Sequence, residues 1–308
     1  MITRSPILFL IFNRPAETKT VFAEIRKARP THLFIAADGP RSGVSGEKEK
    51  CEAVRKITEN IDWRCDVKRL YRKNNLGCKR AISGALGWFF QNVKEGIILE
   101  DDCLPDKSFF RYCEELLIKY RNNKNIGVIG GNNFSRNPKL PDSYYFSLYP
   151  QMWGWATWRR VWKNYDIAMK KWPRLGGNNW LNGLFPVSAQ ATYWWSIFDS
   201  TFRGKVDTWD YQWVFSSFIN GYLNITPNVN LVRNIGFGDQ ATHLRKTRLE
   251  YSRKTNRMMF PMRHPDRVVR NLNADKLEAK YLYNYVSPFV RLKWLFTRGF
   301  LAFKKAMD

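Results

Sequence analysis

The first 130 residues alternate between short apolar runs and amphipathic segments, and this alternation constrains the fold more than any other feature. Strands and helices that alternate in this way are typical of an open, mostly parallel sheet with helices on its faces. The sequence therefore predicts an α/β fold of the doubly wound type. The expected strands cover residues 6–12, 33–37, 67–71, 96–99 and 126–129, and the expected helices cover residues 21–28, 47–60, 81–90 and 109–120.

The second half of the chain has a different texture. After Gly131, segments rich in Asn, Pro and aromatic residues replace the regular alternation, and the sequence contains neither a repeat nor a convincing linker. A chain of 308 residues can bury a large apolar core as one unit. We therefore expect a single domain with an irregular second half.

Three polar clusters follow expected strands. Asn13 and Arg14 come after the first strand, residues 38–41 after the second, and residues 100–102 after the fourth. Ligands bind at the carboxyl ends of strands in sheets of this type. The clusters are therefore expected to meet at one edge of the sheet and to form a binding site.

The cluster Glu100-Asp101-Asp102 places three carboxylates in a row. Such groups repel one another unless a cation neutralises them. A hard divalent ion, Mg²⁺ or Mn²⁺, held by one or two carboxylates and by substrate phosphates, is the usual solution, and it would stabilise a departing nucleoside diphosphate. A solvated acidic turn is the alternative.

The segment Gly96–Tyr112, which reads GIILEDDCLPDKSFFRY, resembles the donor-site segment of the N-acetylglucosaminyltransferase I family. It also resembles bacterial sugar transferases of surface-polysaccharide pathways with the same GT-A fold. The resemblance covers about residues 6–243 and is specific at the acidic triplet. It implies a GT-A type nucleotide-diphospho-sugar transferase fold and a Mn²⁺-dependent reaction.

The resemblance also implies roles for single residues. Asp102 matches the ligand of Mn²⁺ or Mg²⁺, and Glu100 and Asp101 match residues that face the ribose and the sugar. Asn13 and Arg14 resemble the start of the nucleotide site. Asp38 matches a carboxylate that reads uracil, so a UDP-sugar is favoured as the donor.

A second acidic group is needed to take a proton from the acceptor hydroxyl in an inverting reaction. The segment Trp209–Trp213 resembles the family's base-bearing segment, which makes Asp210 the expected catalytic base. Nearby Asp207 remains an alternative for the base, and Asp210 could instead begin a helix that runs to about Ile219. Tryptophan rings suit sugar stacking as well as core packing, so three of them are candidates for either role: Trp155, Trp209 and Trp213.

Two further segments are candidates for contacts with the donor. Arg72 and Lys79 flank the start of the third expected helix, where cations and free N–H groups suit phosphate, although a solvated basic turn is the alternative. His243 ends a glycine-containing loop at residues 236–243 and could contact the diphosphate or the metal. A structural role for His243 remains open.

The formal net charge of +24 predicts affinity for anions. A nucleic-acid-binding protein is one alternative, but the sequence lacks a helix-turn-helix, zinc-finger or RNP-like motif, so no specific nucleic-acid partner is expected. Residues 286–308 predict a basic amphipathic helix, which favours peripheral binding to an anionic membrane over packing on the domain.

Taken together, these features predict a metal-dependent, inverting glycosyltransferase that moves a sugar from a nucleotide-diphosphate donor to a surface glycan or lipid-linked acceptor. Its domain would cover residues 1–285, with a nucleotide-binding half at 1–131 and an acceptor-side half at 132–285. Five cysteines without a Cys-x-x-Cys pair favour the cytoplasm, at the inner face of the inner membrane. A sugar-phosphate nucleotidyltransferase is a further alternative, although it would need a glycine-rich basic loop after the first strand.

Overall fold

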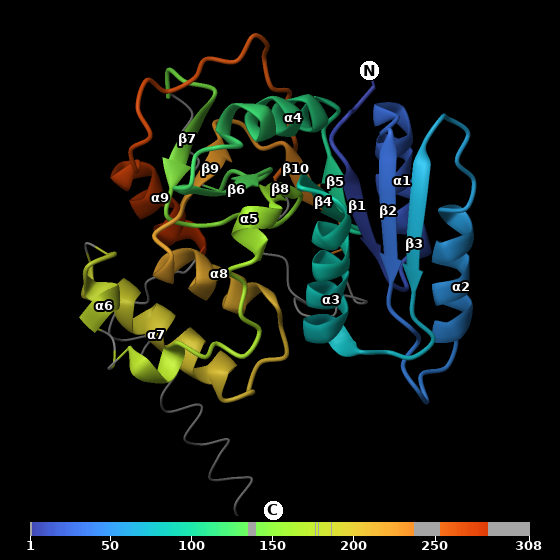
Figure 1. Ribbon diagram of the computed structural model, residues 1–308, viewed down its shortest axis with the longest axis horizontal. Coiled ribbons are helices and arrows are strands. Elements are labelled where there is room, and N and C mark those ends of the chain that lie inside the picture. Colours follow the sequence, from blue (N-terminus) through green and yellow to red (C-terminus); the bar gives the residue numbers. More distant parts are fainter. Residues whose placement is uncertain are drawn as a thin grey trace, which may run out of the picture.

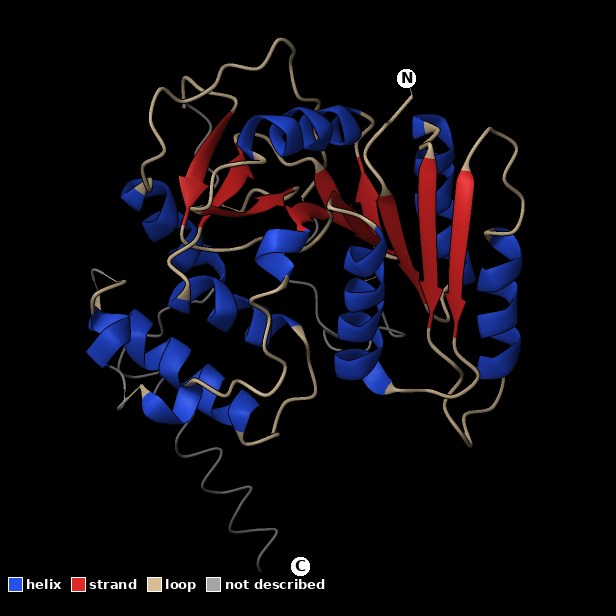
Figure 2. Cartoon of the chain, viewed as in Figure 1, coloured by secondary structure: helices blue, strands red, loops and turns tan. Residues whose placement is uncertain are grey.

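The computed structural model describes residues 2–134, 140–175, 177, 179–185, 187–236 and 253–282. A mixed eight-stranded sheet in the order β3-β2-β1-β4-β8-β6-β9-β7 runs through these residues (Figure 2). Six strands point in one direction, and β7 and β8 run against them. The predicted α/β class and mostly parallel sheet are confirmed. The strands are β1 (Ile7–Ile11), β2 (His32–Ala37), β3 (Asp66–Tyr71), β4 (Glu95–Glu100), β6 (Ile126–Gly130), β7 (Tyr144–Ser147), β8 (Trp155–Trp158) and β9 (Leu223–Pro227).

Helices cover the sheet on both faces. In Figure 1, α3 lies on the near side of the sheet next to β4 and β1, and α1 lies behind β2. The strand order reverses after β3, since β4 returns to pair with β1 on the side opposite β2. A right-handed crossover then places α3 on the face opposite α1. The first four helices are α1 (Pro15–Ala28), α2 (Glu47–Ile57), α3 (Gly77–Asn92) and α4 (Ser108–Tyr120).

The second half is more regular than the sequence predicts. Strands β7, β8 and β9 extend the sheet, and a separate antiparallel pair joins β5 (Cys103–Pro105) to β10 (Val232–Asn234). These strands have three to five residues each and few alternating positions, so they leave no periodic signal in the sequence. The remaining helices are α5 (Arg159–Trp162), the 3₁₀ turn η1 (Trp172–Arg174), α6 (Asn179–Asn182), α7 (Ser188–Phe202), α8 (Asp210–Ile219) and α9 (Leu272–Leu282).

Two apolar cores stabilise this arrangement. The larger core lies on both faces of the sheet, where all five residues of β1 are buried. The smaller core joins α6, α7 and α8, which gather below the sheet in Figure 1. The two cores meet along α8, because Trp213 belongs to the larger core and Phe215 and Phe218 belong to the smaller one. The N-terminal end of α8 is therefore held against the sheet.

Candidate functional site

The strand order reverses between β1 and β4, and the predicted polar clusters surround this point. The last residue of β4, Glu100, lies opposite Leu10 of β1 in the sheet register. The turn after β1 and the acidic triplet after β4 are therefore adjacent. In doubly wound sheets, this reversal opens a crevice in which ligands bind.

Arg14 connects the two turns. Its Nη1 donates to Asp101 Oδ1 at 3.2 Å and to Asp102 Oδ2 at 2.8 Å. The main-chain N–H of Phe12 donates to the other oxygen of Asp101 at 3.0 Å. Charge-assisted bonds of this kind are about twice as strong as neutral ones, so Arg14 fixes the acidic triplet against the end of β1.

One guanidinium does not balance the triplet. Burial, followed by the charges of Asp102 and Asp101, raises the pKa of Glu100 to about 8. Burial and the Asp102 charge likewise raise the pKa of Asp101 to about 7, although Arg14 opposes the shift. Charged carboxylates in this position are therefore costly, and a further cation would lower that cost.

Asp102 is better placed than Asp101 to hold such a cation. Its side chain keeps 13% of its surface exposed, against 6% for Asp101. Among the described residues, no group of three or more His, Cys, Asp or Glu side chains forms a metal cage. Mg²⁺ and Mn²⁺ sites with one or two carboxylates and substrate phosphates need no such cage, so the hard oxygen donors here fit the predicted ion.

The turn after β10 packs directly on Asp102. The N–H of Ile235 donates to the Asp102 carbonyl at 2.7 Å. A Cβ atom at Gly236 would lie 2.4 Å from Asp102 Oδ2 and 2.8 Å from Asp102 Cβ. Only glycine leaves room for this approach. The sequence marked Gly236 as a loop glycine but gave no signal that it touches the acidic triplet.

Asp38 holds the beginning of α3. Its carboxylate accepts hydrogen bonds from the N–H groups of Leu76 and Gly77 at 3.0–3.2 Å. Gly77 has φ of +76°, which glycine adopts readily. Two N–H groups expected to be free for phosphate are thus occupied by Asp38, and a role of Asp38 in reading uracil would have to coexist with these bonds.

Asn13 takes part in a neighbouring network that the sequence did not reveal. Its Nδ2 donates to Glu47 Oε1 at 2.9 Å, and Arg41 pairs with the same carboxylate. Glu47 is 2% exposed, and its hydrogen bond with Arg41 lowers its pKa. Asn13 therefore positions the loop after β2. Glu47 begins a largely polar helix, so its sequence pattern is that of a solvated surface.

Asp210 is the first residue of α8, which agrees with the alternative that it begins a helix. It also lies close enough to Glu100 for the two charges to interact. Thr208 Oγ1 donates to its carboxylate, as does the N–H of Tyr211. The Asp210 charge contributes to the raised pKa of Glu100. Asp207 lies beside Gly77, where a Cβ would be 3.3 Å from its Oδ2.

Cys78 shows how closely these acids approach one another. Burial, then the charges of Glu100, Asp210, Asp207 and Asp38, raises the pKa of its thiol to about 12. The described residues thus bring four acids from three segments to the start of α3. This convergence joins the predicted base region to the predicted donor region.

The three candidate tryptophans belong to the core instead of a sugar-binding surface. Trp155, Trp209 and Trp213 are 0%, 4% and 1% exposed. The ring of Trp155 stacks on that of Trp209 at 5.8 Å, and Trp213 lies 5.8 Å from Trp155 on a tilted plane. Because the rings cover one another, they leave no open face for a sugar.

The remaining candidates have varied positions. Arg72 reaches across α3, where its Nη2 would lie 3.0 Å from a Cβ at Gly84. Lys79 lies in the first turn of α3. His243 and the basic segment 286–308 lie outside the described residues.

Within the part of the chain that is described, no helix is both long and apolar enough to cross a bilayer.

Comparisons with known proteins reveal only distant similarity. No protein-family model and no curated protein matches the chain. HddC from Yersinia pseudotuberculosis is 8% identical, with 52% of this chain and 80% of that chain covered and a TM-score of 0.31. The inositol-1-phosphate CTP transferase from T. maritima is also 8% identical, with coverage of 52% and 73% and a TM-score of 0.33. A UDP-glucose pyrophosphorylase in complex with UDP-glucose is 11% identical, with coverage of 53% and 79% and a TM-score of 0.31. Similarity at this level assigns neither a family nor a function.

Proposed function

We propose that the chain is a metal-dependent glycosyltransferase of the GT-A type that uses a nucleotide-diphosphate sugar, with a UDP-sugar favoured. The observation that carries the proposal is the group of carboxylates Glu100, Asp101 and Asp102 at the sheet reversal, of which Asp101 and Asp102 share the guanidinium of Arg14. The resemblance of this segment to the N-acetylglucosaminyltransferase I donor site supports it. The acceptor is a hydroxyl of a surface glycan or a lipid-linked saccharide.

In the proposed reaction, Asp102 holds Mn²⁺ or Mg²⁺, while Glu100 and Asp101 orient the ribose and the sugar. The bound ion supplies neutralisation of the charge that builds up on the diphosphate. The acceptor oxygen bonds to the anomeric carbon as the bond from that carbon to the diphosphate oxygen breaks. Asp210 takes the hydroxyl proton, which gives inversion in a single displacement.

A sugar-phosphate nucleotidyltransferase is the second candidate. Strand-end carboxylates with a metal serve both classes, and two of the solved structures named above are, by title, a CTP transferase and a pyrophosphorylase. The turn after β1 is short, because only residues 12–14 separate β1 from α1. Asn13 and Arg14 in that turn bond to Glu47 and to the acidic triplet. This arrangement favours the glycosyltransferase.

One turnover experiment separates the two candidates. We expect the purified protein to release UDP from at least one UDP-sugar when Mn²⁺ is present, and to lose this activity in EDTA or as Asp102→Ala. Pyrophosphate release from UTP and a sugar 1-phosphate, without UDP release from any UDP-sugar, would establish the second candidate instead. The peripheral membrane role of residues 286–308 is a separate proposal, which a flotation assay with anionic vesicles tests directly.

A further inference from the structure

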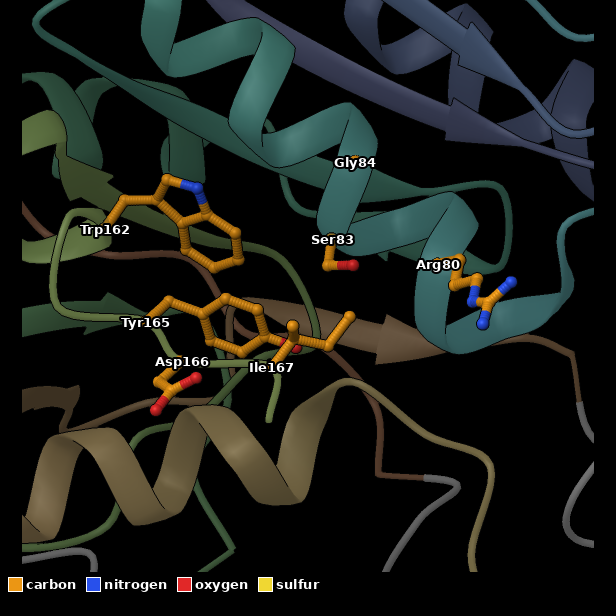
Figure 3. A pocket seen from close by; sticks show the side chains of 7 residues that line it. All are labelled: Arg80, Ser83, Gly84, Trp162, Tyr165, Asp166 and Ile167. Atoms are coloured by element: carbon orange, nitrogen blue, oxygen red, sulfur yellow. The ribbon is translucent and has the colours of Figure 1, made fainter. Parts of the chain in front are cut away.

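A shallow cavity of about 380 Å³, open to solvent, lies between α3 and the segment after α5 (Figure 3). One wall is the exposed side of α3, with Arg80, Ser83 and Gly84. The opposite wall is the end of α5 and the segment after it, with Trp162, Tyr165 and Ile167. Its volume is enough for one side of a small ligand, whose other side would stay in solvent.

The lining combines aromatic and polar groups. Tyr165 stacks on Trp162 with ring centres 4.4 Å apart and an angle of 12° between the planes. Ser83 and Tyr165 line the cavity from opposite walls, and the Ser83 hydroxyl donates to the Lys79 carbonyl at 2.6 Å. Arg80 adds a cation at the rim. Trp162 is buried behind this stack, so the partly exposed Tyr165 ring supplies the aromatic surface. That surface, next to the Ser83 hydroxyl and the Arg80 guanidinium, suits a saccharide.

Asp166 also lines the cavity but serves mainly to shape it. Its oxygens accept the N–H groups of Ala168 at 3.0 Å and Lys170 at 2.6 Å. These bonds fix the turn that carries Tyr165 and Ile167. The aromatic wall is therefore held in place before any ligand binds, which lowers the entropy cost of binding.

Tyr165 connects the cavity to the predicted base. Its hydroxyl donates to the main-chain carbonyl of Trp209 at 3.3 Å, and Asp210 is the next residue. Cys78, which the acids of the donor site surround, is also near enough to affect the ionisation of Tyr165. Tyr165 therefore links this wall of the cavity to the residue that precedes the predicted base.

We infer that this cavity is a binding subsite for a sugar unit of the acceptor. The inference rests on the proposed function for the reaction that this sugar undergoes, whereas binding of a saccharide can be measured without turnover. Gly84 gives the sharpest test because it is exposed and lines the cavity. A Cβ there would meet only the far end of Arg72, at 3.0 Å.

The experiment compares Gly84→Leu with Gly87→Leu, which adds the same side chain to the same helix outside the cavity, where nothing lies within 4 Å of a new Cβ. Methyl α-glucopyranoside and glucose 1-phosphate serve as a neutral and an anionic probe. Their binding is titrated by saturation-transfer NMR in the presence of UDP and Mn²⁺. We expect at least one probe to bind, Gly84→Leu to weaken its binding at least fivefold, and Gly87→Leu to leave it unchanged.

The inference is overturned if neither probe binds the wild-type protein, or if the two leucine variants bind the probes equally. UDP binding is measured in the same samples. Normal UDP binding with no effect of Gly84→Leu on the probes would remove the subsite and leave the proposed function intact. Probe binding that is lost only in Gly84→Leu, without any binding of UDP or turnover of UDP-sugars, would keep a saccharide site and remove the glycosyltransferase.

Discussion

Arg14 Nη1 lies 2.8 Å from Asp102 Oδ2, so the side chain expected to hold a divalent ion is already paired with a guanidinium. The same nitrogen reaches Asp101. A cation therefore already occupies one side of the acidic triplet. A divalent ion bound at Asp102 must share the carboxylate with Arg14 or displace it, and this relationship leads to the first prediction.

Arg14→Met removes the cation and leaves the triplet uncompensated. Loss of one partner of a largely buried ion pair is expected to lower the free energy of unfolding by about 3 kcal/mol in EDTA. Mn²⁺ should then stabilise the variant more than the wild-type protein, because the ion takes over the neutralisation. Urea unfolding with and without Mn²⁺ measures both effects.

Arg26→Met is the matched control. Arg26 pairs with Asp62, but the two side chains are 56% and 44% exposed, and exposed pairs contribute little. We expect almost no change in stability and no change in the response to Mn²⁺. An equal loss of stability in both variants would show that Arg14 does not compensate the triplet.

The pair Asp210 and Asp207 gives the second prediction. Asp210→Asn should preserve binding of UDP with Mn²⁺ and reduce kcat about 100-fold or more, because general base catalysis contributes factors of that size. Asp207→Asn should reduce kcat much less. If the larger loss of kcat instead follows Asp207→Asn, then Asp207 is the base.

Gly236 leads to the third prediction. Gly236→Ala would place a Cβ 2.4 Å from Asp102 Oδ2, so Asp102 has to move. We expect affinity for Mn²⁺, measured by isothermal titration calorimetry with UDP present, to fall at least tenfold. Gly87→Ala, whose Cβ would meet nothing within 4 Å, should bind Mn²⁺ normally. Unchanged affinity in both variants would place the ion away from Asp102.

The sequence predicts the first half of the fold closely, because most strands there are apolar runs, most helices have an apolar stripe, and even the weaker β3 and the polar α2 continue the alternation of strand and helix. The helix expected at residues 47–60, for example, is found as Glu47–Ile57. The convergence of Arg14 with the acidic triplet also follows from the strand order. What the sequence does not predict depends on contacts between distant segments, such as Gly236 on Asp102 or Glu47 with Asn13.

The aromatic residues illustrate a different limit. Trp155 lies in a four-residue strand and Trp213 in α8, and both are buried because these elements pack on each other. A tryptophan that binds sugar and a tryptophan in a core have the same local sequence signal. Only the packing of β8 against α8 distinguishes them.

This packing gives the fourth prediction. Trp213 is 1% exposed and its ring lies 5.1 Å from that of Trp162, which lines the cavity. Trp213→Ala should lower the free energy of unfolding by about 3–5 kcal/mol through the space it leaves. Trp213→Phe should cost less. If Trp213→Phe instead weakens binding of a UDP-sugar without loss of stability in urea, the ring has a role in binding.

The fifth prediction concerns a buried acid far from the triplet in sequence. Glu278 in α9 is 0% exposed and accepts a hydrogen bond from Gln151. Burial, and then the charge of Asp275, raises the pKa of Glu278 well above its usual range. The folded protein therefore keeps a proton that the unfolded chain releases above about pH 4.3.

The sign of the effect follows from this difference in proton binding. Since the folded state binds more protons, the stability associated with Glu278 is fully present below its ordinary pKa and is lost as the pH rises toward the pKa in the folded protein. Glu278→Gln cannot ionise, so it should be more stable than the wild-type protein at pH 8 and lose less stability between pH 5 and pH 8. Urea unfolding at both pH values measures this difference. Glu52→Gln, at an exposed position of α2, controls for the loss of one carboxylate, and equal pH slopes for all three proteins would mean that Glu278 is ionised in the folded state.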